Sequence, residues 1–233
     1  MRIAVDLGHT LNGGDIGANG YLKETSINRE YGPLLMAGLR KLGHTVTDVT
    51  PTQNGLTLAQ SLAYRVNKSN AFKADLFISC HVNAFKTDAA NGCEAEYISA
   101  KAKVYADKIN AQMAILGYKN RGSISRPNLY VLKYTNATAI LIEPFFCDTK
   151  SDCNKYNAQK LANAIVKGIT GKDIPGAIVT PVITKPMSVP TKATVTSDKT
   201  YRVITGSFTS EVNADVRIAE LKAKGFESFK VLI

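Results

Sequence analysis

The sequence predicts an α/β fold: a three-layer αβα sandwich with a mostly parallel sheet of about six strands, followed by a small C-terminal βαβ module. Short runs rich in Val and Ile alternate with longer segments of helical apolar spacing, which is typical of a sheet covered by helices. Hydrophobic residues make up 45% and charged residues 21% of the 233 residues, the balance of a globular protein. No apolar run approaches the roughly 20 residues that a membrane-spanning helix needs, so we expect no membrane insertion.

The apolar runs and the stretches between them predict the elements in order. Strands are expected at residues 2–6, 45–49, 75–80, 94–98, 129–132 and 139–142. The helical stripes between them are Ile27, Tyr31, Leu34, Leu35 and Leu42; Leu58, Leu62, Val66 and Phe72; Val104, Ile109, Met113 and Leu116; and Leu161, Ile165 and Ile169. Pro33 falls inside the first stripe, where it removes a backbone hydrogen bond, so that helix is either kinked or begins at Pro33.

A change of composition divides the chain. Residues 173–200 hold four of the eight prolines and no Leu, Phe or Tyr, which predicts an extended linker without a core. Residues 1–172 then form the main domain, and residues 201–233 form a tail of strand, helix and strand. A unit of 33 residues is too small to bury a full core by itself.

The chain is basic, with a net charge of +10, and residues 1–172 carry most of the excess. Such a surface suits an anionic partner such as nucleic acid, a membrane surface or an acidic wall polymer. Because the Lys and Arg residues are scattered and no basic cluster contains aromatic residues, we expect no nucleic-acid partner. The four cysteines include no C-x-x-C pair; the spacing of Cys147 and Cys153 would allow a disulfide, but free thiols are expected.

Three of the predicted strands end in chemically useful side chains. His9, His81 and Glu143 each follow or end an apolar run, and catalytic groups gather beyond the carboxyl ends of parallel strands. Two histidines at such positions predict a zinc site, which needs a third ligand. Glu24, after the glycine-rich segment 13–20, is the leading candidate, and Asp15 is its rival. The remaining histidine, His44, is expected to be structural.

A set of short motifs then occurs in a specific order over residues 1–172. They are Asp6-Leu7-Gly8-His9, Gly17 to Glu24, Ser79-Cys80-His81-Val82-Asn83-Ala84, Asn120-Arg121-Gly122 and Ile142-Glu143-Pro144-Phe145-Phe146. This set resembles the zinc-dependent N-acetylmuramoyl-L-alanine amidases of the amidase 3 type, found in autolysins and phage endolysins. The family often has glycine after its first histidine, where this chain has Thr10.

The resemblance implies roles for particular residues. His9, Glu24 and His81 would bind Zn²⁺, and Glu143 would be the catalytic base that acts on water. The bond cleaved would join N-acetylmuramic acid to the L-alanine of the peptidoglycan stem peptide. Arg121, Asn83 and Phe85 are further candidates for binding the substrate, because stem peptides carry carboxylates and Arg binds these well.

Two other functions stay open at this point. A zinc peptidase that cuts within the stem peptide would use the same ligands, and a non-catalytic wall-binding protein would need no stoichiometric zinc. The tail contains Tyr201-Arg202-Val203, Gly206-Ser207-Phe208, Ala214 and Lys224-Gly225-Phe226, and these residues resemble half of a SPOR domain, a peptidoglycan-binding module. Two chains could complete each other as a homodimer, which we favour; the tail could also dock on the domain of residues 1–172 or stay loose.

The predicted route to the substrate follows from the first residues. An acidic residue, Asp6, interrupts the first apolar run, so we expect no signal peptide and synthesis in the cytoplasm. The protein would then reach the cell wall after holin-mediated release, as an endolysin, or after lysis of the mother cell, as a sporulation autolysin.

Overall fold

The structure is a computed structural model that describes residues 1–53, 55–175 and 218. The predicted linker at residues 173–200 and the predicted module at residues 201–233 lie almost entirely outside these residues. Their proposed roles therefore remain sequence-based predictions. Within the described residues, no helix is long and apolar enough to cross a membrane.

A six-stranded sheet forms the centre of the described domain. Its strands are β1 (Arg2–Asp6), β2 (Thr45–Asp48), β3 (Leu76–Cys80), β4 (Cys93–Tyr97), β5 (Asn120–Ser125) and β6 (Thr138–Glu143). They lie in the order β2-β1-β3-β6-β4-β5, and every neighbouring pair is parallel except β4 and β6. The predicted α/β class and the mostly parallel sheet are therefore confirmed.

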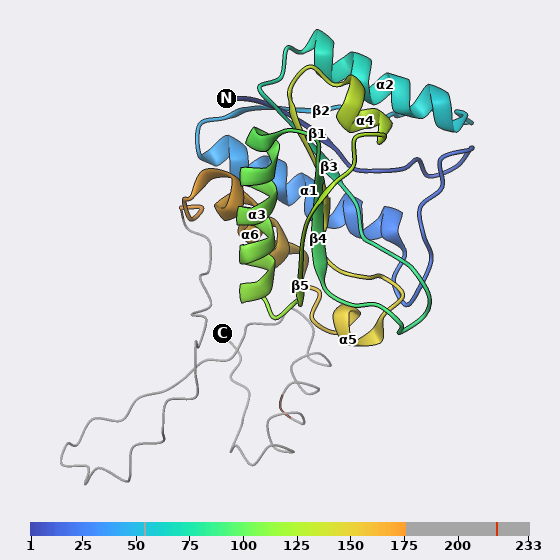
Figure 1. Cartoon of the computed structure of the whole chain (residues 1–233), viewed down its shortest axis with the longest axis vertical. Coiled ribbons are helices and arrows are strands. Elements are labelled where there is room, and N and C mark those ends of the chain that lie inside the picture. Colours follow the sequence, from blue (N-terminus) through green and yellow to red (C-terminus); the bar gives the residue numbers. More distant parts are fainter. Residues whose placement is uncertain (54, 176–217, 219–233) are drawn as a thin grey trace, which may run out of the picture. The chain divides into compact units, whose positions relative to one another are not determined.

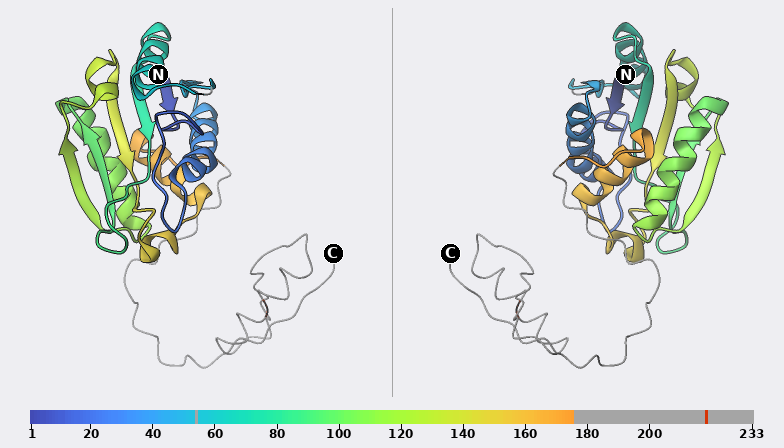
Figure 2. Two further views of the ribbon diagram at one scale, coloured as in Figure 1. Left: turned by 90° about the vertical axis from the view of Figure 1, so that its right-hand side faces the viewer. Right: turned by 90° about the vertical axis from the view of Figure 1, so that its left-hand side faces the viewer.

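Helices cover both faces of this sheet (Figures 1 and 2). They are α1 (Glu24–Lys41), α2 (Leu58–Ala71), α3 (Ala100–Ile115), α4 (Tyr130–Tyr134), α5 (Lys150–Cys153) and α6 (Ala158–Thr170). Alternate strand residues point to opposite faces: Ile3 and Val5 pack with α1, α3 and α6, whereas Ala4 packs with α2 and α4. The second face thus has the smaller helical cover.

One predicted strand is wrong and one strand was missed. The apolar run 129–132 lies largely in helix α4, because a run of four apolar residues does not distinguish a strand from a buried helical turn. The missing strand is β5, which pairs with β4 at the edge of the sheet. Its sequence is mostly polar and only partly buried, so it carries no apolar signal.

Helix α1 runs through Pro33, so the expectation that it begins there is wrong. Pro33 has no N–H to donate to the carbonyl of Arg29, four residues earlier. Burial compensates for the lost bond, because Tyr31, Leu35 and Leu39 of the same helix are fully buried. All four cysteines carry free thiols, as expected.

A buried ionic network joins helix α2 to the sheet. Arg65 of α2 is only 1% exposed, and its Nε lies 2.6 Å from Asp6 Oδ1 while its Nη1 lies 2.8 Å from Asp15 Oδ2. The hydroxyl of Ser79 on β3 donates to the other oxygen of Asp6 at 2.8 Å. One guanidinium therefore connects β1, β3, the segment after β1 and α2.

We expect the substitution Arg65→Met to lower the free energy of unfolding by about 3–5 kcal/mol, because it leaves two carboxylates buried without their cation. Urea unfolding of the purified protein measures this difference. Arg40→Met on the exposed side of α1 is the matched control and should change the stability by no more than about 0.5 kcal/mol. Equal effects of the two substitutions would contradict the importance of the network.

Candidate active site

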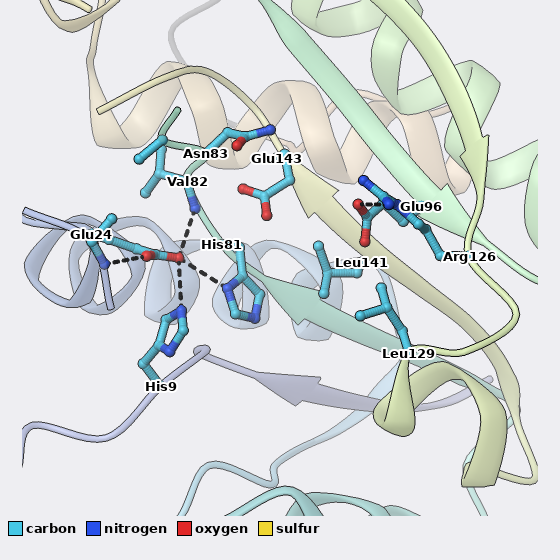
Figure 3. Close-up of a pocket in the computed structure, with 12 residues that line it drawn as sticks. His9, Glu24, His81, Val82, Asn83, Glu96, Arg126, Leu129, Leu141 and Glu143 are labelled. Atoms are coloured by element: carbon cyan, nitrogen blue, oxygen red, sulfur yellow. Dashed lines mark hydrogen bonds and ion pairs between the residues drawn. The ribbon is translucent and has the colours of Figure 1, made fainter. Parts of the chain in front are cut away.

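The three strands that end in candidate site residues are neighbours in the sheet, in the order β1-β3-β6. His9 follows β1 by three residues, His81 directly follows β3, and Glu143 is the last residue of β6. All three side chains line one cleft of about 510 Å³, together with Glu24 (Figure 3). The structure thus brings together the residues that the sequence placed at strand ends.

His9, Glu24 and His81 form a tight cluster of potential metal ligands. Their donor atoms all lie within 4.8 Å of one another. Glu24 Oε1 lies 2.9 Å from His81 Nδ1 and 3.2 Å from His9 Nε2. The other oxygen of Glu24 accepts a hydrogen bond from the backbone N–H of Ala18 at 2.8 Å, which fixes the orientation of the carboxylate.

The chemistry and spacing of this cluster fit a zinc ion. Two imidazoles and one carboxylate are a common set of three protein ligands at catalytic zinc. Bonds of about 2.0–2.1 Å in a tetrahedral arrangement separate the donor atoms by roughly 3.4 Å. The separations between Glu24 and the two histidines, 2.9 and 3.2 Å, are close to this value.

The backbone at Gly8 and His9 is left-handed, and this conformation explains why a glycine stands at position 8. His9 has φ of 50° and Gly8 has φ of 57°, so two consecutive residues adopt the left-handed conformation. A Cβ at Gly8 would lie 2.4 Å from the backbone oxygen of Cys80, which only glycine avoids. The strained turn aims the His9 imidazole back toward Glu24, an arrangement often found at functional sites.

Asp15, the rival third ligand, lies behind His9 rather than in the cluster. Its Oδ1 is 2.8 Å from His9 Nδ1, and its Oδ2 contacts Arg65 and Ser61. It therefore orients the imidazole so that the opposite nitrogen, Nε2, faces Glu24. Among the described residues, Glu24 therefore shares the cluster with both histidines, whereas Asp15 does not.

Glu143 is half-buried beside this cluster, and its Oε2 atom is buried without a hydrogen-bond partner in the described part of the chain. Burial raises the pKa of Glu143 well above its usual value, and the negative charges of Glu24, Glu96 and Glu94 add to this effect. The opposite holds for Glu24: burial opposes ionisation, but the hydrogen bonds with His81 and His9 outweigh it and lower the pKa of Glu24. The two carboxylates thus have contrasting environments.

The other sequence candidates lie in different places. Asn83 lines the cleft and donates to Glu94 Oε1 at 2.9 Å. Arg121 does not line it; its Nε is 2.6 Å from Glu94 Oε2, and its guanidinium stacks over Phe146. Phe85 is 78% exposed and is also absent from the cleft wall.

Sequence reasoning missed the far end of the cleft, which Glu96, Arg126 and Leu129 line. Glu96 lies on β4 two residues after Glu94, and acidic residues at this spacing point to the same face of a strand. Two carboxylates on one face of a buried strand could therefore have identified Glu96 as a candidate cleft residue. No local sequence pattern identified Arg126 as a cleft residue, because the edge strand that precedes it, β5, was not predicted.

Comparison with known proteins agrees with this geometry. The family model of N-acetylmuramoyl-L-alanine amidases, Amidase_3, matches residues 3–171. The chain belongs to this amidase family. The match extends over the sheet from the second residue of β1 onward and includes all the described residues of the cleft.

Individual relatives include proteins of Clostridium perfringens and Bacillus subtilis. An uncharacterized protein of Clostridium perfringens, CPE1502, is 30% identical over 182 residues, covering 75% of this chain and 53% of its own length. The sporulation-specific N-acetylmuramoyl-L-alanine amidase of Bacillus subtilis is 27% identical, covering all of this chain and 85% of its own. Several curated relatives are thus about twice as long as the region they share with this chain.

A solved structure supports the fold in detail. The catalytic domain of the CD27L endolysin targeting Clostridia Difficile has 33% sequence identity and a TM-score of 0.70. The similarity covers 75% of this chain and 99% of that domain. The amidase fold of the described domain is therefore confirmed.

His9 predicts a pH dependence of stability in the metal-free amidase domain. Burial lowers the pKa of His9, but hydrogen bonds with Asp15 and Glu24 outweigh it and raise the pKa from 6.5 to about 9. A group whose pKa is raised by folding stabilises the folded state while protonated. This contribution is fully present below about pH 6.5 and is lost as the pH rises through about 9.

We therefore expect His9→Gln to remove part of the stability loss between pH 6.5 and 9, measured by urea unfolding in the presence of a chelator. His44→Gln is the matched control, since burial lowers the pKa of His44, and it should retain the loss seen in the parent. The same pH profile for the parent and for His9→Gln would refute the assignment.

Proposed function

We propose that the domain is a peptidoglycan hydrolase that cleaves the amide between N-acetylmuramic acid and the L-alanine of the stem peptide. The single observation that carries this proposal is a His-Glu-His donor cluster, spanning 4.8 Å, in one cleft with the half-buried Glu143. Membership of the amidase family supports the choice of bond.

His9, Glu24 and His81 would hold one Zn²⁺ in this cleft. Bound there, zinc would supply the Lewis acid that polarises the amide carbonyl and the charge that makes water acidic enough to attack near neutral pH. Neighbouring groups fix the orientation of two of these ligands: Asp15 contacts His9 Nδ1, and the backbone N–H of Ala18 donates to Glu24. Little rearrangement of the side chains would be needed.

Glu143 would act as general base and then as general acid. Its Oε2 atom has no hydrogen-bond partner among the described residues, so it is available to accept the proton of the attacking water. The same oxygen would then donate that proton to the departing amine of L-alanine, which cannot leave as an anion. Asn83 lines the cleft next to His81 and would contact the substrate there.

A zinc peptidase that cleaves within the stem peptide would use the same residues, and so would be identical in metal content. Mass spectrometry of purified muropeptides after digestion separates the two reactions. The proposed amidase leaves N-acetylmuramic acid without a peptide and a free L-alanine amine, whereas a peptidase shortens the peptide. A non-catalytic wall-binding protein would leave the muropeptides intact.

The cell wall is the proposed partner, and release by holin-mediated or mother-cell lysis remains the proposed route. Endolysins and a sporulation-specific amidase, both among the relatives, would reach the wall in these ways. For the C-terminal part we retain the linker at residues 173–200 and a wall-binding or dimerising SPOR-like half-module at residues 201–233. Composition and the quoted resemblance support them.

We expect elemental analysis of the purified protein to give about one zinc per chain, and His81→Ala to lose most of it. The loss of one of three ligands lowers metal affinity strongly. His44→Ala removes a histidine that does not belong to the cluster and should keep the parent's zinc content. Full zinc retention by His81→Ala would refute the proposed ligand set.

Glu143→Gln should retain zinc but lower the rate of amide cleavage by at least about 100-fold, since it preserves the shape and removes the proton acceptor. Release of free amine from a soluble muropeptide measures the rate, and metal analysis on the same sample shows that the site is intact. Near-normal turnover would show that Glu143 is structural.

A further inference from the structure

Acidic side chains outnumber lysine and arginine side chains among the described residues that line the cleft. Glu24, Glu96 and Glu143 contribute three carboxylates, whereas Arg126 is the one lysine or arginine among the described lining residues. Carboxylates at short range repel an anionic ligand strongly in a partly dry cleft. A compensating cation would therefore favour an acidic stem peptide, and away from the proposed metal cluster Arg126 is the one basic side chain among the described lining residues.

The backbone and the Nε atom of Arg126 are held in place, while the end of its side chain stays available for a ligand. It directly follows β5, and its backbone N–H donates to the carbonyl of Tyr97 at 2.9 Å. Its Nε donates to Glu96 Oε1 at 3.1 Å, and Glu96 is buried, so one edge of the guanidinium is fixed. The side chain is still 53% exposed, and its two terminal nitrogens have no partner in the described part of the chain.

Figure 3 places Arg126 beside Glu96 at one end of the cleft and the His9–Glu24–His81 cluster at the other, with Glu143 between them. Leu129 and Leu141 form an apolar wall next to Arg126. A peptide whose first amide lies at the cluster can extend along this wall toward the guanidinium. Terminal nitrogens of Arg match a carboxylate in a bidentate arrangement.

We propose that Arg126 is the binding site for a carboxylate of the stem peptide and makes the enzyme select a carboxylate over the corresponding carboxamide. This inference rests on the proposed function, and it names a specificity-determining residue for it. Glu96 is the positioning residue that holds the guanidinium by Nε and leaves the terminal nitrogens for the ligand.

Arg121 provides a matched comparison in the same region. Its Nε pairs with Glu94, and its guanidinium lies 4.9 Å from the centre of the Phe146 ring, outside the cleft wall. Both arginines therefore pair with an acidic residue of β4, but only Arg126 faces the cleft. A substitution of Arg121 should not distinguish a carboxylate from a carboxamide.

The test uses the full chain and two muramoyl-L-alanyl peptides that differ only in a carboxylate or a carboxamide on the second amino acid. We expect Arg126→Gln to lower kcat/KM for the carboxylate peptide by about 10–100-fold, the scale of charged hydrogen bonds, and to change the carboxamide peptide by less than about threefold. Arg126→Lys should restore part of the preference. Arg121→Gln should change both peptides by the same factor.

Binding gives a readout independent of cleavage. Isothermal titration of the same two peptides into Glu143→Gln, with and without Arg126→Gln, should show the carboxylate preference only when Arg126 is present. If binding shows this preference but the parent protein cleaves no amide, the Arg126 site is supported and the proposed function is refuted. Equal losses for both peptides on Arg126→Gln, or equal binding of both by the parent, would overturn the proposal.

Discussion

The buried guanidinium of Arg65 is the interaction on which the geometry of the site depends. Its two acidic partners, Asp6 and Asp15, come from the end of β1 and from the segment that follows it. Asp15 in turn contacts His9 Nδ1, so a helix on one face of the sheet orients a side chain at the strand end. A buried cation with two buried anions is costly to desolvate, and the ion pairs that Nε and Nη1 of Arg65 make offset this cost.

The unequal cover of the two sheet faces creates the cleft. Helices α1, α3 and α6 pack along one face, while the other has α2 and the five-residue α4. Near the end of β6 this second face is left to Glu143, Leu141 and the residues of β4 beside them. Because β4 runs antiparallel to β6, it places Glu94 opposite Glu143 and Glu96 opposite Leu141. The reversed direction of β4, which β5 shares, thus concentrates carboxylates in the cleft.

Two of these carboxylates have contrasting environments. Glu24 lies between two imidazoles that favour its charged form, whereas Glu143 has no hydrogen-bond partner on Oε2 within the described residues and faces other acids. Pairs of titratable groups whose surroundings push their pKa values apart are typical of acid–base sites.

The sequence by itself determined the alternating α/β class and the position of His9, His81 and Glu143 at strand ends, because periodicity and strand termini are local properties of the chain. Only the tertiary structure decided that β5 is an edge strand and that residues 130–134 form helix α4. It also placed Asp15 behind His9, paired Arg121 with Glu94 and brought Arg126 into the cleft. These outcomes depend on contacts between segments far apart in sequence, which no local pattern of residues specifies.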